Sequence, residues 1–235
     1  DMVELRADYL DADELPRLAE FPALVARRIG DANIPIIVTI RRPAEGGKFK
    51  GTETERLRLL AAAWRTMPAQ PTYRYLDLEA DTRSAALETA VEKAGGTIIR
   101  SMYDFHGVPA DPAGLIRELG RRPGEIPKLA CFPQTTADLI PLFKAAAVGY
   151  GKPFILLGMG PFGFPLRVLG PRIGTFLAYA SDPDASAAPG QISTAELDTV
   201  YRFHEQNPKT AIFGIIGNPV LHSRSPAYHN AQFRQ

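Results

Sequence analysis

Short apolar runs alternate along this chain with segments in which apolar residues recur every three or four positions. The apolar runs predict seven strands, at residues 2–9, 34–41, 73–80, 97–105, 126–133, 153–160 and 175–181. The segments between most of them predict amphipathic helices. Strands that alternate with helices at this spacing form parallel sheets with crossover helices. Two architectures satisfy the pattern, a doubly wound open sheet and a (β/α)8 barrel.

Two of the predicted helices carry N-terminal caps in their sequence. Thr52 and Glu55 have the spacing of a capping box before the helix that follows them. Ser84 precedes a helical segment that ends on a pair of glycines. These caps fix where the two helices begin.

Polar residues interrupt five successive predicted strands, and this pattern favours one of the two architectures. Alternate residues of a strand share one face, and strands of an open parallel sheet are almost wholly apolar. A barrel with a polar lumen accommodates such residues, with its chemistry at the C-terminal strand ends. We therefore predict a (β/α)8 barrel; in a second interpretation the charges lie exposed at a rim. The polar positions are Glu4, Arg6 and Asp8; Thr39 and Arg41; Asp77 and Glu79; Ser101 and Tyr103; and Lys128.

Composition and charge exclude several classes of function. The 235 residues are 45% hydrophobic and 23% charged, with a net charge of +1, so nucleic acids and anionic membranes are poor partners. No apolar run approaches the roughly 20 residues of a membrane span, and no secretory signal opens the chain. Cys131 is the single cysteine and is expected to be a small buried hydrophobe. The four histidines have no zinc-site spacing. We expect a cytoplasmic, metal-free protein.

Lys128 gives the strongest chemical signal in the chain. It lies in an apolar run, where loss of hydration lowers the pKa of a lysine and frees its amine. A neutral lysine in a barrel lumen forms a Schiff base with a ketone or aldehyde. The alternative is a lysine at a strand end whose ammonium group reaches solvent.

Three glycine-containing loops carry four further candidate residues for a site. Arg41 and Glu45 lie on the loop after the second predicted strand, where they can meet over a ligand. Arg167, on a loop rich in glycine and proline, suits a bidentate grip on a carboxylate. Gln191 lies on a small-residue loop that can close over a ligand. Each loop also fits a plain solvated connection.

The order of seven short motifs resembles type I 3-dehydroquinate dehydratase over roughly residues 1–193. The motifs are ELRADYLD, TIRRPAEGG, YLDLEA, SMYDF, IPKLACFPQ, GMGPFGFPLRVLGPRIGT and SAAPGQIS. The resemblance implies a (β/α)8 barrel that converts 3-dehydroquinate to 3-dehydroshikimate and water through a lysine imine. It implies no cofactor and no metal, and a place in the shikimate pathway to aromatic amino acids.

The resemblance also implies roles for individual residues. Lys128 matches the imine-forming lysine, and Glu45 matches a glutamate that orients the general base. Contacts with substrate are implied for Glu4, Arg6 and Arg41 on the ring hydroxyls, Asp77 lining the site, Met159 against the ring, Arg167 on the carboxylate and Gln191 on the closing loop.

Tyr103 stands where the family has the histidine that shuttles the proton. An imidazole with a pKa near 6.5 serves as base and then as acid at neutral pH, whereas a phenol near pKa 10 is a poor base. His106 follows three residues later and does not match the family's catalyst. We therefore expect slow or absent dehydration, with imine formation retained and Tyr103 in the catalytic position.

Two other departures concern the loops and the strand count. Ala187 takes the place of a serine in the closing loop, with Ser186 one residue earlier, and Leu166 precedes Arg167 where serine is usual. The family's first strand–helix unit has no counterpart and would precede Asp1, which explains seven predicted strands rather than eight.

Residues 210–233 resemble the opening of shikimate dehydrogenase, with a strand, a turn and a His-Ser-x-Ser-Pro signature. Ser223 and Ser225 match hydroxyls that bind the carboxylate of shikimate in that family. We predict a dehydratase-like barrel over 1–206 and a truncated α/β segment, the start of a dehydrogenase substrate-binding domain, over 207–235. NADP would bind only in the missing part of that second domain.

The resulting hypothesis is a 3-dehydroquinate dehydratase, with 3-dehydroquinate as its small-molecule partner and a fused shikimate dehydrogenase in the parent chain. This hypothesis is compatible with a homodimer. The main alternative is a non-catalytic substrate-binding or scaffolding barrel of such a fusion, which Tyr103 favours. A third hypothesis is another lysine-imine lyase that acts on a different ketone.

Overall fold

Six strands form one parallel sheet in this protein, whose computed structural model describes residues 1–31, 33–64, 71–181, 192–217, 219–220 and 222–233. The strands are hydrogen-bonded in chain order. Each lies within one of the first six predicted runs, so those predictions are confirmed with shorter bounds. The strands are β1 (Val3–Arg6), β2 (Ile36–Thr39), β3 (Tyr75–Glu79), β4 (Thr97–Asp104), β5 (Ile126–Cys131) and β6 (Ile155–Gly158).

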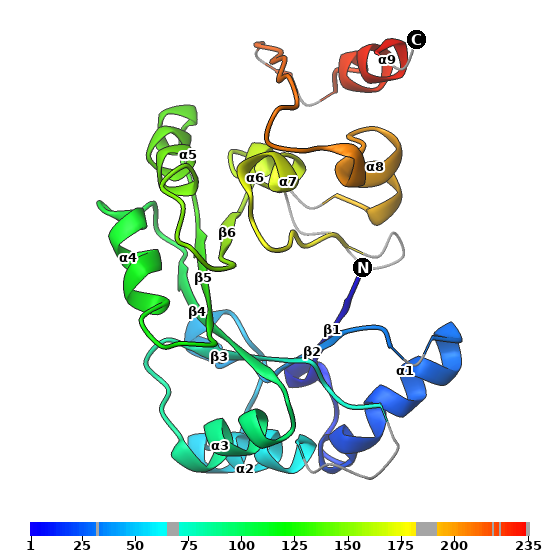
Figure 1. Cartoon of the computed structure of the whole chain (residues 1–235), viewed down its shortest axis with the longest axis vertical. Coiled ribbons are helices and arrows are strands. Elements are labelled where there is room, and N and C mark those ends of the chain that lie inside the picture. Colours follow the sequence, from blue (N-terminus) through cyan, green and yellow to red (C-terminus); the bar gives the residue numbers. More distant parts are fainter. Residues whose placement is uncertain (32, 65–70, 182–191, 218, 221, 234–235) are drawn as a thin grey trace. The chain divides into compact units, whose positions relative to one another are not determined.

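Helices follow the strands as the alternating pattern predicts (Figure 1). The hydroxyl of Thr52 accepts a hydrogen bond from the backbone N–H of Glu55 at 3.2 Å, and Ser84 caps its helix through Leu87 at 3.4 Å. The two predicted caps are therefore confirmed. The helices are α1 (Phe21–Ile29), α2 (Glu53–Ala63), α3 (Ala85–Lys93), α4 (Pro112–Leu119), α5 (Leu139–Ala146), α6 (Phe164–Val168), α7 (Gly170–Ile173), α8 (Thr194–Thr199) and α9 (Ser225–Gln232).

The predicted seventh strand at 175–181 is wrong for the residues that the structure describes. One ladder-like bond runs from the backbone N–H of Phe176 to the carbonyl of Phe154 at 2.7 Å. The hydroxyl of Thr175 then accepts from the N–H of Leu156, so a side chain takes the place of the backbone partner. A single bridge, Ser181 with Ser193, follows. The apolar run is therefore extended without forming a regular ladder.

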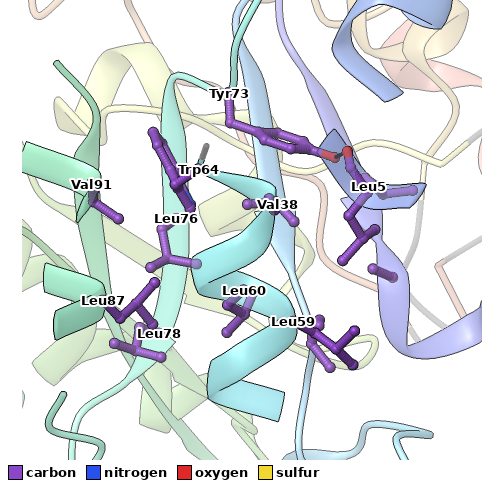
Figure 2. Close-up of a cluster of buried hydrophobic side chains, with 14 of the residues drawn as sticks. Leu5, Val38, Leu59, Leu60, Trp64, Tyr73, Leu76, Leu78, Leu87 and Val91 are labelled. Carbon is purple, nitrogen blue, oxygen red and sulfur yellow. Dashed lines mark hydrogen bonds between the residues drawn. The ribbon is translucent and has the colours of Figure 1, made fainter. Parts of the chain in front are cut away.

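The chain divides into two compact units, one of residues 1–102 and 119–127 and the other of residues 103–118 and 128–235. In the first unit, α2 and α3 pack their apolar faces on β2 and β3 (Figure 2). Leu60 of α2 and Leu76 of β3 are fully buried there, and Leu87 of α3 is 1% exposed. This core holds the C-terminal ends of β1 to β4 in register, with Arg6 opposite Thr39.

In the second unit, β5 pairs with β6, and Lys128 is the register partner of Ile155. A small apolar cluster of Val168, Ile192 and Leu197 joins α6 to α8. The segment 210–217 has no regular structure, so the strand expected there is wrong. Its apolar side chains are exposed, Ile216 fully and Phe213 by 75%. Within the described residues, no helix combines the length and the apolar character that crossing a membrane needs.

Candidate active site

Seven of the ten polar residues predicted on strand faces are buried, and the other three, Glu4, Arg6 and Tyr103, are half-buried. Arg41 is 2% exposed, Asp77 1% and Lys128 1%. The interpretation in which these charges lie exposed at a rim is therefore wrong for these residues. Burying an ion alone costs several kcal/mol, so each such group needs a partner or a ligand. The structure shows how each unit meets this requirement.

Arg41 lies at the centre of a buried ionic cluster in the first unit. Its Nη2 lies 2.7 Å from the Oδ1 of Asp77, and its Nη1 donates to the hydroxyl of Ser101 at 2.9 Å. Ser101 in turn donates to the same Asp77 oxygen at 2.6 Å. Glu79 lies 3.5 Å from the guanidinium. The cluster joins the C-terminal ends of β2, β3 and β4, where a parallel sheet places its chemistry.

Glu45 is held over this cluster by a tight turn. Gly46 takes a left-handed φ of 78°, and the N–H of Gly47 donates to the carbonyl of Arg42 at 2.9 Å. The nearest oxygen of Glu45 lies 3.7 Å from Arg41. That oxygen is buried without a hydrogen-bond partner in the part of the chain that the structure describes. Burial raises the pKa of Glu45 to about 7, against a smaller opposing effect of Arg41.

Glu4 and Arg6 of β1 have separate partners in the first unit. Glu4 accepts a hydrogen bond from the hydroxyl of Thr39 at 2.7 Å. Arg6 makes a bidentate pair with Asp8, with both N–O distances 2.9 Å. Asp8 also accepts from the backbone N–H of Lys48, on the loop after Gly47. The side chain of Arg6 remains 37% exposed, so part of its surface is open to a ligand.

Lys128 is the buried amine of the second unit. Its Nζ lies 2.8 Å from the hydroxyl of Tyr179. The centroid of the Tyr179 ring lies 4.4 Å from the same nitrogen, and that of Tyr103 lies 5.4 Å from it. Aromatic faces at these distances attract a cation. Lys128 is thus 1% exposed, and the alternative in which its amine reaches solvent is wrong.

Tyr103 and His106 lie in different surroundings. Tyr103 is half-buried at the end of β4 and stacks on Phe105 with ring centroids 5.8 Å apart. His106 is exposed, on a turn in which the carboxylate of Asp104 accepts from its backbone N–H at 2.9 Å. Of these two candidates, Tyr103 is therefore the one whose side chain faces the amine.

Met159 and Arg167 complete the predicted residues of the second unit that the structure describes. Met159 follows β6, where its N–H donates to the carbonyl of Cys131 at 2.7 Å. Arg167 of α6 donates through Nη1 to the backbone carbonyl of Tyr179 at 2.5 Å. Burial lowers the pKa of Arg167. A partly buried guanidinium held by one carbonyl keeps other N–H groups for an anion.

Two groups of predicted residues have other outcomes. Gln191, Ala187 and Ser186 lie outside the described residues. Ser223 accepts a hydrogen bond from the N–H of Ser225 at 3.3 Å, at the start of α9. Among the residues that the structure describes, no cluster of three His, Cys, Asp or Glu side chains could hold a metal ion.

Arg56 and Tyr179 are two residues of these clusters that were not predicted from the sequence. Arg56 lies on the apolar face of α2 with Leu59, Leu60 and Ala63, and this helical spacing was the available signal. It is fully buried and pairs with Glu79. Tyr179 gave no comparable signal, because its contact with Lys128 joins positions 51 residues apart.

The fold and the buried amine define an α/β protein with a parallel sheet and a candidate nucleophilic lysine. The sequence matches the family of type I 3-dehydroquinase over residues 1–208. The chain belongs to this family, and the predicted dehydratase, a hydro-lyase of the shikimate pathway, is confirmed at that level.

The relatives divide into single-function and fused proteins. A bifunctional 3-dehydroquinate dehydratase/shikimate dehydrogenase of Arabidopsis thaliana is 30% identical over 239 residues, which cover 100% of this chain and 38% of that protein. A 3-dehydroquinate dehydratase of Methanosarcina barkeri is 30% identical, with 87% of this chain and 86% of that protein covered. The solved dehydratase of Geobacillus kaustophilus has a TM-score of 0.74 at 28% identity, covering 86% of this chain and 79% of its own.

Proposed function

We propose that the chain converts 3-dehydroquinate to 3-dehydroshikimate and water through an imine on Lys128. The observation that carries this proposal is the burial of the Lys128 amine on β5, with 1% of the residue exposed. Burial favours the neutral, nucleophilic form of an amine. The iminium formed with the substrate ketone withdraws electrons, acidifies the neighbouring C–H and so permits loss of water. The reaction as proposed uses no metal or cofactor.

The proposed substrate contacts follow the chemistry of each side chain. Arg167 suits the substrate carboxylate because its guanidinium is bound in the structure through one nitrogen, Nη1, to a carbonyl. Carboxylates and guanidinium groups of the first unit suit ring hydroxyls. These residues are Glu4, Arg6, Arg41 and Asp77. Met159 is proposed to pack against the ring, Gln191 to contact substrate from its loop, and Glu45 to orient the general base.

Tyr103 is proposed to slow the dehydration step. The centroid of its ring lies 5.4 Å from the Nζ of Lys128, so the ring face can stabilise a positive charge on that nitrogen. An ordinary phenol removes a proton from carbon poorly at neutral pH. The same observation supports the second candidate function, a barrel that binds substrate without turning it over and supports a fused dehydrogenase.

Residues 207–235 are proposed to begin a shikimate dehydrogenase domain, after a dehydratase barrel over 1–206. The match to the bifunctional Arabidopsis protein covers 100% of this chain, whereas that to the Methanosarcina barkeri dehydratase covers 87%. The exposed apolar side chains of Ile212, Phe213 and Ile216 fit a strand that is buried in a complete domain. Ser223 and Ser225 would then bind shikimate, and NADP would bind beyond this segment.

We further propose that the six strands belong to a complete (β/α)8 barrel. With six strands present, a complete (β/α)8 barrel needs one strand–helix unit before β1 and one further strand after β6. We also propose a homodimer, and a cytoplasmic location on the composition of the chain; the Arabidopsis relative is named as chloroplastic.

Chemical trapping tests the imine proposal directly. The protein is incubated with 3-dehydroquinate, reduced with borohydride and mapped by mass spectrometry. We expect an adduct on Lys128 that is lost in Lys128→Met and retained in Lys144→Met, which removes an exposed lysine of α5.

The mass of the adduct separates the candidate functions. An adduct lighter than the substrate imine by one water shows dehydration. An adduct that retains this water shows capture without dehydration and supports the slowed enzyme. Absence of any adduct on Lys128 would contradict the imine and favour the scaffolding barrel.

A further inference from the structure

We propose that Tyr179 is a catalytic residue of imine formation, whose hydroxyl relays protons between the nitrogen of Lys128 and the substrate oxygen; this inference rests on the proposed function of Lys128. The hydroxyl lies 2.8 Å from the reacting nitrogen, which is ordinary hydrogen-bond distance. A phenol both donates and accepts a proton. The hydroxyl is therefore placed at the atom where the covalent bond forms.

Two tyrosines face the amine, and their geometry gives them different tasks. Tyr103 presents its ring, with the centroid 5.4 Å from Nζ. Tyr179 presents both its ring, at 4.4 Å, and its hydroxyl, at 2.8 Å. A ring face stabilises a cation but transfers no proton. Proton transfer needs a hydrogen bond of about 2.6–3.2 Å between heavy atoms, and Tyr179 supplies it.

Arg167 fixes Tyr179 in this position. Its Nη1 donates to the backbone carbonyl of Tyr179 at 2.5 Å, while the side chain of the same tyrosine reaches Lys128. One residue therefore contacts both the proposed imine-forming amine and the proposed carboxylate-binding cation. Because the backbone is held by Arg167, removal of the Tyr179 hydroxyl should leave the position of the ring largely unchanged.

The relay balances in protons and electrons. The lone pair of neutral Lys128 attacks the ketone carbon, a C–N bond forms, and the π pair of the carbonyl moves to oxygen. Tyr179 gives its proton to that oxygen and receives one from the nitrogen, so the carbinolamine is neutral and the phenol is unchanged.

Loss of water from the carbinolamine uses the same hydroxyl. The C–O bond breaks as the nitrogen lone pair forms the C=N bond, and the departing oxygen takes the proton of Tyr179. The products are water, an iminium and a phenolate beside it. The opposite charges lie adjacent in a buried site, where their attraction is stronger than in water.

The rate of borohydride trapping tests this relay. Tyr179→Phe keeps the ring and removes the hydroxyl, and Tyr150→Phe is a matched control because its hydroxyl donates to the carbonyl of Ala145 instead. We expect Tyr179→Phe to slow adduct formation on Lys128 at pH 7 by on the order of 100-fold, the usual range for acid–base catalysis. The control variant Tyr150→Phe should form the adduct on Lys128 at a rate within about twofold of that of the unchanged protein.

A second variant separates proton transfer from positioning. In Tyr179→His an imidazole replaces the phenol, and we expect faster trapping than in Tyr179→Phe, with a new pH dependence near the imidazole pKa of about 6.5. Rates are compared at equal folded fractions, taken from denaturant unfolding curves. Trapping in Tyr179→Phe at the unchanged rate would overturn the relay, as would a histidine variant no faster than the phenylalanine one.

The outcomes also separate this inference from the function on which it rests. If the unchanged protein forms no adduct on Lys128, the imine proposal itself fails. If it forms the adduct and Tyr179→Phe forms it equally fast, the imine stands and only the role of Tyr179 is lost.

Discussion

Arg56 Nη1 lies 2.8 Å from the Oε2 of Glu79, and each side chain is only 1% exposed. Arg56 comes from α2 and Glu79 from the end of β3. The same guanidinium nitrogen donates to the carbonyl of Ile40 at 2.9 Å, and Glu79 accepts from the backbone N–H of Arg42 at 3.2 Å. This pair therefore connects α2 to the loop that carries Arg41 and Glu45. The position of that loop depends on the buried ion pair of Arg56 and Glu79.

Replacement of Arg56 by Leu should destabilise the protein by about 3–5 kcal/mol, because it leaves the Glu79 carboxylate buried with fewer partners. Denaturant unfolding measures this change. Arg17→Ala is the control, because Arg17 and Glu20 form a pair with side chains 66% and 50% exposed. Exposed pairs contribute at most about 1 kcal/mol. Equal effects of the two substitutions would contradict the structural role of Arg56.

Glu45 should make stability depend on pH between about 4.5 and 7. Burial raises its pKa to about 7 in the folded protein, from 4.5 in the unfolded chain. Across this window the unfolded chain has already lost its proton while the folded protein retains it. The free energy of unfolding contributed by Glu45 is therefore largest below about pH 4.5 and falls as pH rises to about 7.

Glu45→Gln should remove this component of the pH dependence. The measurement is the denaturant midpoint at pH 5 and at pH 8 for both proteins. We expect a smaller decrease for the glutamine variant between the two pH values, because its side chain does not ionise. An unaltered decrease would show that other groups cause the dependence. Glu20→Gln, at an exposed position, provides the comparison.

Gly47→Ala should displace Arg41. An added Cβ would lie 1.9 Å from the carbonyl oxygen of Arg41 and 2.3 Å from its carbonyl carbon, so the backbone must move. Forcing atoms into an occupied space costs about 1–3 kcal/mol. We expect that loss of stability in denaturant unfolding, together with a raised KM. Gly107→Ala is the control, because nothing lies within 4 Å of its added Cβ; a similar loss there would refute the explanation.

Tyr103→His should raise the rate of dehydration. An imidazole at the end of β4 would supply a base that operates at neutral pH. We expect this rate to increase on the order of 100-fold, within the usual range for acid–base catalysis. The rate is measured from the ultraviolet absorbance of the conjugated enone product. His106→Ala, which removes an exposed imidazole, should leave the rate unchanged. If Tyr103→His dehydrates the substrate no faster while it still forms the adduct on Lys128, the tyrosine at position 103 is not the cause of slow dehydration.

Local sequence determined much of the fold. The apolar runs located β1 to β6 because short apolar runs between turn residues and helical segments are typical of strands in a sheet that helices cover. Thr52 and Ser84 located two helix starts because a capping hydroxyl bonds an N–H only three residues away. The polar residues within those strands, such as Asp77 and Lys128, already indicated that their charges had to be satisfied internally.

The tertiary structure alone decided which groups satisfy those charges. Arg56 reads in sequence as one charge on a helix, and only the packing of α2 on the sheet places it against Glu79. Thr175 replaces a backbone partner with its hydroxyl at the start of the expected seventh strand, which no periodicity reveals. Tyr179 meets Lys128 across 51 positions. Residue patterns encode short-range geometry, whereas contacts between distant positions depend on how whole elements pack.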